Sequence, residues 1–93
     1  MSIVIIGGNE RMVCQYTDIC KDYGYKAKVF PKENGAIRKK IGCPDLMVLF
    51  TNTVSHKMVR CAVAEAERCN ADVVRSHTSS GSALTEILER VCG

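Results

Sequence analysis

Residues 3–8 of this chain read Ile-Val-Ile-Ile-Gly-Gly, an unbroken β-branched run that stops at two glycines. An apolar run without polar alternation is typical of a strand buried on both faces, as in a parallel sheet covered by helices. Gly7 and Gly8 then allow a sharp turn, because glycine adopts backbone conformations that a side chain forbids. A helical pattern follows at once, with Asn9 in the N-cap position. An open α/β sheet places its ligand at a loop of this kind.

The alternation of strand and helix continues through the chain. Further strands are expected at residues 27–30, 46–50 and 72–75. Apolar positions recur at helical spacing within residues 12–23, 58–69 and 83–92. Such alternation predicts a parallel sheet with helices on both faces, joined by right-handed crossovers. With the two most apolar strands in the middle, we predict a three-layer α/β/α, flavodoxin-like fold. Its four-stranded parallel sheet has the order 2-1-3-4, and residues 1–93 form a single domain.

A weaker helix is expected over residues 33–40, with Ile37 and Ile41 facing inward and Gly42 ending it. Its residues 38–40 are the dense basic cluster Arg-Lys-Lys. The formal net charge of the chain is only +3, and aromatic residues make up only 5%. We interpret the cluster as a solvated helix face and expect no nucleic-acid partner, because there is little to stack on bases.

The composition, with 46% hydrophobic and 25% charged residues, is that of an ordinary globular domain. A chain of 93 residues buries a modest core, so we expect it to form a homodimer. The first apolar run is too short for a signal peptide or a membrane span, and no basic region precedes it. We therefore expect a cytoplasmic protein without a membrane partner. In that compartment its six cysteines, none in a Cys-x-x-Cys pair, are expected to be free thiols.

The predicted strand order places the switch point between the first and third strands. Three loops border this crevice and supply the candidate ligand-binding residues. These are Gly7, Gly8, Asn9 and Arg11 in the first loop, Thr51, Asn52, Thr53 and His56 in the second, and Ser79, Ser80 and Gly81 in the third. Each loop leads into a helix N-terminus, whose free N–H groups and partial positive charge favour an anion. Equally, the glycines could serve as a tight turn and the serines as helix caps.

His56 is the most informative of these residues, because a cap at Thr53 or Ser55 places it in the first turn of a helix. The helix dipole there favours the neutral imidazole, which suits metal ligation, haem ligation or acid–base chemistry. The alternative is a histidine that only helps to cap its helix. His77 has the same two interpretations.

Cys14 and Cys61 lie on helix flanks and are the candidate reactive thiols, because a nearby Arg11 or Lys57 would favour a thiolate. The remaining cysteines are interpreted as small buried residues. Some other classes with this fold are excluded by their loops. A response-regulator receiver needs acidic residues after the first strand and an Asp ending the third, and a phosphotransferase domain or small tyrosine phosphatase needs a cysteine in the first loop. Residues 7–9 are Gly-Gly-Asn, and residues 50–51 are Phe-Thr.

Three segments together resemble a known family. They are the strand ending in Gly-Gly with Arg11, the Val-Ser-His segment at residues 54–56, and the Ser-Ser-Gly loop at residues 79–81. In this combination the chain resembles a widespread family of small prokaryotic domains of unknown function. The resemblance covers nearly the whole chain and implies the α/β fold. The chain departs from the family pattern in having Asn9 in place of a basic residue and no cysteine ahead of residues 54–56.

Three hypotheses for function follow. The first is a binding or sensing module that holds a small anionic ligand or a cofactor, with haem bound through His56 as its specific form. The second is a thiol-dependent or phosphate-handling enzyme that uses Cys14, Cys61 or the serine-rich loop at residues 79–82. The third is a dimeric interaction domain without a small ligand, whose edge strands make the contacts.

Overall fold

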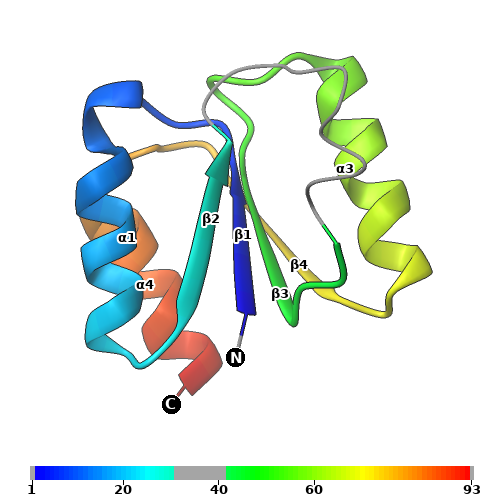
Figure 1. The fold of residues 1–93 in the computed structure, drawn as a ribbon. Coiled ribbons are helices and arrows are strands. Elements are labelled where there is room, and N and C mark those ends of the chain that lie inside the picture. Colours follow the sequence, from blue (N-terminus) through cyan, green and yellow to red (C-terminus); the bar gives the residue numbers. More distant parts are fainter. Residues whose placement is uncertain (1, 31–41, 93) are drawn as a thin grey trace.

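Four parallel strands form a single sheet in the order β2-β1-β3-β4 in a computed structural model, which describes residues 2–30 and 42–92 (Figure 1). The strands are β1 (Ser2–Ile6), β2 (Lys26–Phe30), β3 (Leu46–Phe50) and β4 (Asp72–Ser76). Ile3 of β1 lies beside Ala27 of β2 and Leu46 of β3, and all three pairings are parallel. The predicted fold class and strand order are therefore confirmed.

Helices cover both faces of this sheet. A 3-10 helix (Glu10–Met12) leads into α1 (Val13–Asp22), which lies beside α4 (Gly81–Cys92) on one face (Figure 1). On the opposite face lies α3 (His56–Arg68). These are the three layers that the alternating pattern predicted.

The two central strands are buried because each side chain meets one of two separate cores. Along β1, Ile3 and Ile5 face α1 and α4, whereas Val4 and Ile6 face α3. All five residues of β3 are fully buried. Because successive side chains of a strand point to opposite faces, only an uninterrupted apolar run can serve both cores. The sequence pattern of these strands thus follows directly from the layers.

Some predicted features fall outside the residues that the structure describes. The expected short helix at residues 33–40, with Ile37, Ile41 and the basic cluster, is among them. The side chain of Cys92, expected to extend the apolar stripe of the last helix, is another. Along the described part of the chain, no helix is both long and apolar enough to cross a membrane.

The prediction of six free thiols is wrong for one pair, because Cys43 and Cys69 form a disulfide. Cys43 lies in the turn before β3, and Cys69 is the C-cap of α3. The parallel crossover returns the chain to the same end of the sheet, so their Cα atoms lie 5.4 Å apart despite a separation of 26 residues. This distance is typical of disulfides. The pair was not predicted because the expected redox compartment does not reveal which cysteines lie close together in the folded chain.

Candidate functional site

The loop after β1 makes the sharp turn that its two glycines predict. Gly7 and Gly8 have φ values of +93° and +91°, in the left-handed region that favours glycine. Neither position has room for a side chain. A Cβ on Gly7 would lie 2.6 Å from Val54 Cγ1, and one on Gly8 would lie 2.8 Å from Tyr16 Cε2. The loop therefore packs directly against α1 and against the loop between β3 and α3.

Three backbone N–H groups in this segment, which the sequence offers to an anion, already donate to protein oxygens. The N–H of Gly8 donates to Thr53 Oγ1 over 2.7 Å. That of Asn9 donates to Tyr16 Oη over 3.4 Å. The N–H of Arg11 donates to Asn9 Oδ1 over 2.9 Å, which confirms Asn9 as a cap, here of the 3-10 helix. An anion bound to these groups would have to replace existing hydrogen bonds.

The serine-rich loop before α4 is also engaged by the protein. The hydroxyl of the buried Tyr16 donates to the carbonyl oxygen of Ser79. Ser80 Oγ accepts from the N–H of Ala83 over 3.2 Å and so caps the first turn of α4. Gly81 is buried against α1. In the structure these three predicted site residues make packing and capping contacts.

The loop between β3 and α3 presents His56 as expected. Ser55 is the N-cap of α3, and its side-chain oxygen accepts from the N–H of Met58 over 3.2 Å. His56 is consequently the first residue of the helix, and its side chain is exposed. Asn52 is exposed, whereas the hydroxyl of Thr53 is used by the glycine loop. Asn52 and His56 therefore both present exposed functional groups at this end of α3.

Thr51 connects this loop to the end of β4. Its hydroxyl donates to the carbonyl oxygen of Ser76 over 3.2 Å, and its oxygen lies 3.1 Å from His77 Nδ1. This contact holds the His77 ring beside the start of the loop between β3 and α3.

A pocket of about 300 Å³ lies where these groups meet, lined by Thr51, Val54, His56, Val59, Arg75 and His77. A second hollow of about 300 Å³ shares His56, Val59 and Arg75 with it and continues along α3 to Glu67. We call the two together the α3–β4 groove. The groove brings Thr51 and His56, two of the predicted site residues, to one cavity.

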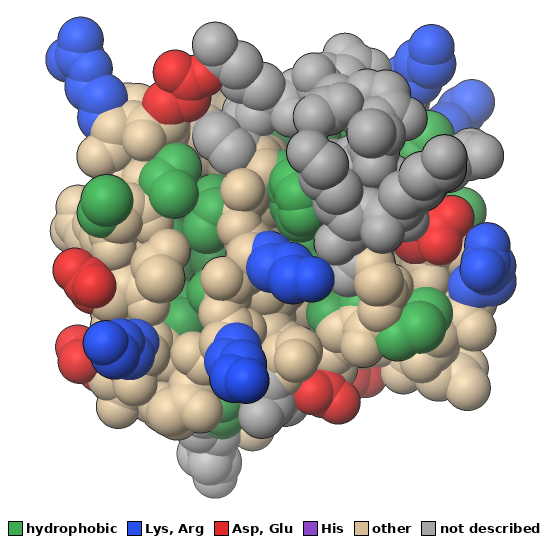
Figure 2. All heavy atoms as spheres, viewed as in Figure 1, with side chains coloured by type: hydrophobic (Ala, Val, Ile, Leu, Met, Phe, Trp, Pro, Cys, Tyr) green, Lys and Arg blue, Asp and Glu red, His purple; other side chains and the backbone are tan. Residues whose placement is uncertain are grey.

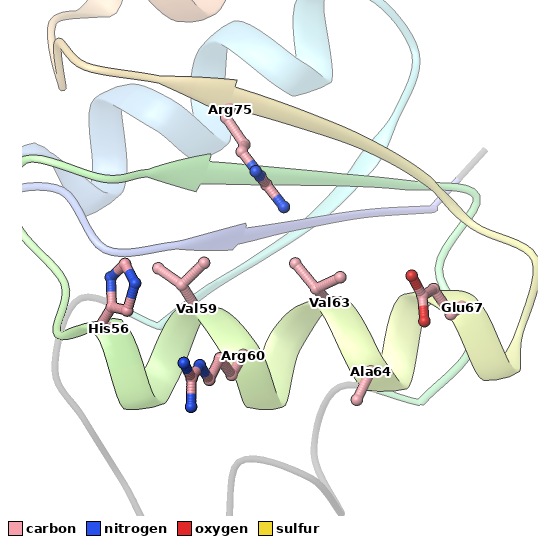
Figure 3. Close-up of a pocket in the computed structure, with 7 residues that line it drawn as sticks. All are labelled: His56, Val59, Arg60, Val63, Ala64, Glu67 and Arg75. Carbon is pink, nitrogen blue, oxygen red and sulfur yellow. The ribbon is translucent and has the colours of Figure 1, made fainter.

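Arg75 reaches into this groove from β4. Figure 3 shows its side chain extending from the strand toward α3, with His56 at one end of the helix and Glu67 at the other. No carboxylate of a described residue lies within ion-pair distance of the Arg75 guanidinium. The groove thus combines a cation, two imidazoles and a hydroxyl with the apolar side chains of α3.

The ligand-binding residues chosen from sequence did not include Arg75, and His77 was considered only as a second histidine with the same two interpretations as His56. Arg75 and His77 both come at the end of the fourth strand, and the predicted order places that strand directly beside the third. Because the carboxyl ends of neighbouring parallel strands share one edge of the sheet, the strand order was the signal that could have found them. The residues chosen from sequence instead surround the crevice between the first and third strands, with His56 as the most informative of them.

Metal and thiol chemistry find limited support in the described residues. Among them, no group of three or more His, Cys, Asp or Glu side chains could hold a metal ion, so His56 as a metal ligand stays a prediction. Burial raises the pKa of the Cys20 thiol to about 11, which suits its predicted packing role. Cys14 is exposed as a free thiol, and Cys61 is partly exposed.

The chain matches, over residues 2–91, the model of a family described as an uncharacterized protein conserved in bacteria, DUF2325. It belongs to this family of unknown function, which confirms the resemblance carried by the glycine, Val-Ser-His and serine-rich segments. None of the curated proteins compared with the chain matches it.

Two solved structures are similar to this chain. The lactose-specific IIB component domain of the phosphoenolpyruvate:carbohydrate phosphotransferase system from Streptococcus pneumoniae is similar with a TM-score of 0.64 and 16% identity, covering 99% of this chain and 94% of that one. A putative pilus assembly protein (cpaE) from Burkholderia thailandensis E264 gives a TM-score of 0.48 and 14% identity, over 99% and 98% of the two chains. At this identity the first likeness supports the flavodoxin-like fold alone.

Proposed function

We propose that this domain binds a small anionic ligand in the α3–β4 groove. The observation that carries the proposal is Arg75, whose guanidinium reaches into a pocket that also holds His56 and His77. A guanidinium offers several N–H donors in a fixed fork, which matches a carboxylate or a phosphate. The proposal moves the expected ligand from the crevice between β1 and β3 to the neighbouring crevice between β3 and β4.

The surroundings of Arg75 support an anion in particular. The N-terminus of α3, a helix of 13 residues, lies at the same end of the groove and adds a partial positive charge. The Thr51 oxygen and the imidazoles of His56 and His77 supply further hydrogen-bonding groups around the cavity. Val54 and Val59 form an apolar wall, so a ligand there would be partly shielded from water. A volume of about 300 Å³ is at the small end for ligand pockets.

The experiment is a calorimetric titration with inorganic phosphate and, separately, with malonate at constant ionic strength. The proposal expects saturable binding of at least one of them. Arg75→Gln should weaken it about 10- to 100-fold, because a charge-assisted hydrogen bond is lost. Arg68→Gln is the matched control, since Arg68 is an exposed residue of α3 outside both hollows. No saturable binding, or equal loss in both variants, would overturn the proposal.

Haem is the second candidate for the same groove. The observation in its favour is the exposed imidazole of His56 beside the partly exposed side chains of Val59 and Val63. An axial histidine next to an apolar surface is the arrangement that haem requires. Addition of haemin should then produce a Soret band that is lost in His56→Ala and kept in His77→Ala. The absence of a Soret band, or an unchanged spectrum in His56→Ala, removes this candidate.

A further inference from the structure

Among residues 2–30 and 42–92, the outer edge of β4 presents backbone hydrogen-bonding groups that no other strand uses. In a parallel strand the N–H and C=O of one residue point to the same side, and those of the next residue to the other. The N–H of Asp72 and the C=O of Ser76 bond to the segment that contains β3. By this alternation, Val73 and Arg75 direct their backbone groups away from β3. Among the described residues, β4 pairs with no other strand.

The other edge of the sheet is protected. The carbonyl of Phe30 accepts from the N–H of Gly7, so by the same alternation the backbone groups of Ala27 and Val29 point away from β1. The protection comes from Lys26 and Lys28, which are exposed on this strand, and Figure 2 shows basic side chains over the surface where β2 lies. Lysines on an edge strand disfavour pairing with another sheet. In contrast, β4 has the sequence Asp-Val-Val-Arg-Ser and carries no lysine.

We propose that a second copy of this chain docks antiparallel on the β4 edge, which joins the two sheets into one of eight strands. The docking does not depend on the proposed ligand. When the antiparallel pairing is centred on Val74, Val73 of each copy lies opposite the partner's Arg75. Each of these two pairs exchanges two backbone hydrogen bonds, which gives four in all. A register centred on Arg75 would instead place two arginines directly opposite each other, which is unfavourable.

The charges of α3 fit this two-fold arrangement. The helix has Arg60 near its His56 end and Glu67 near its other end, and both line the groove beside β4 (Figure 3). A two-fold axis through Val74 makes the α3 helices of the two copies antiparallel. The partner's Glu67 then lies beside Arg60, and the partner's Arg60 lies beside Glu67. Since the same surface is used twice, every favourable contact occurs twice.

Apolar side chains complete the surface. Val63 of α3 and Val73 of β4, which do not line the pocket that holds His77, are only partly buried in a single copy. Docking on β4 would bring the two α3 helices together over these side chains and remove them from water. Thr51 and His77 lie outside β4 (Asp72–Ser76), so the strand pairing does not use them. Arg75 contributes its backbone to the pairing and keeps its side chain in the groove.

The experiment measures the dissociation constant of the dimer by sedimentation equilibrium, without ligand. Val73→Pro removes an N–H that the single copy does not use in its sheet, and edge strands tolerate proline. The variant should stay folded by circular dichroism and dimerise about 100-fold more weakly, because two hydrogen bonds are lost and the rings obstruct the approach. The matched control is Ala27→Pro at an outward position of β2, which should leave the dissociation constant unchanged.

Charge reversal tests the register. Glu67→Arg should weaken the dimer about tenfold at low salt, and the double variant Arg60→Glu with Glu67→Arg should restore it. A wild-type chain that stays monomeric up to about 1 mM overturns the proposal, as does a dimer that Ala27→Pro breaks and Val73→Pro does not. Phosphate titration of the folded Val73→Pro variant separates the two proposals. If it binds as wild type does, the ligand site stands whatever the oligomeric state.

Discussion

The two faces of the sheet differ in how completely they are closed. On one face two helices, α1 and α4, pack over a core that includes the buried Tyr16, Leu84 and Leu88. On the other, α3 is the one helix among the described residues, and Val59 and Val63 remain partly exposed beside the groove. The glycine loop belongs to the closed region, because Tyr16 and Thr53 use its donors. A loop typical of ligand sites can therefore be used up by packing, whereas the open face keeps His56 and Arg75 exposed.

The largest expected effect is a loss of stability when a buried side chain on the closed face is shortened. Leu88→Ala should lower the free energy of unfolding by about 3 kcal/mol, because Leu88 is fully buried between α4 and the sheet and its loss leaves a cavity. Val63→Ala on the open face should cost less than about 1 kcal/mol, since Val63 is only partly buried. Urea unfolding followed by circular dichroism measures both. Equal losses would mean that the two faces are equally well packed.

An intermediate effect is expected at the glycine loop. Gly8→Ala should cost about 2 kcal/mol, because it combines an unfavourable φ of +91° with a Cβ only 2.8 Å from Tyr16 Cε2. Gly24→Ala is the matched control, with a φ of +78° and nothing within 4 Å of its Cβ. The control should cost about 1 kcal/mol, from backbone conformation alone. Thermal unfolding gives both values, and a Gly8→Ala variant as stable as the control would show that this loop is not closed by α1.

Much of the fold could be predicted from sequence, because its strongest signals are local. The two continuous apolar runs at residues 3–6 and 46–50 identified the central strands, and with the alternation of helices they led to the correct strand order. Asn9 was predicted as a cap and Ser55 as one of two candidate caps, because capping depends on residues only two or three positions apart.

The candidate site was less predictable, because it depends on contacts between distant segments. That Tyr16 uses its hydroxyl to hold the loop before α4 follows from how α1 packs beside that loop, which no spacing reveals. The groove exists because α3 does not cover the side chain of Arg75. The position of a helix on a sheet also depends on packing between distant segments. The disulfide between Cys43 and Cys69 needed proximity across 26 residues.

The smallest expected effect concerns the hydroxyl of Tyr16. Tyr16→Phe keeps the ring packed against Phe50, whose centroid lies 5.4 Å away, but leaves the carbonyl of Ser79 and the N–H of Asn9 without this partner. We expect a loss of about 1 kcal/mol in the free energy of unfolding. Tyr23→Phe is the control, because the Tyr23 hydroxyl donates to Glu89 over 3.4 Å at an exposed position.

Amide hydrogen exchange sharpens this last test, because stability alone does not locate the effect. In Tyr16→Phe the amides of residues 8–9 and 79–80 should exchange faster than in the wild type, while those of α3 stay unchanged. If closure of the glycine loop is what prevents anion binding there, the same variant should also gain a weak phosphate response that Arg75→Gln does not remove. An unchanged exchange rate in both loops would show that packing of the ring alone holds them, and the hydroxyl would then have no part in closing this face.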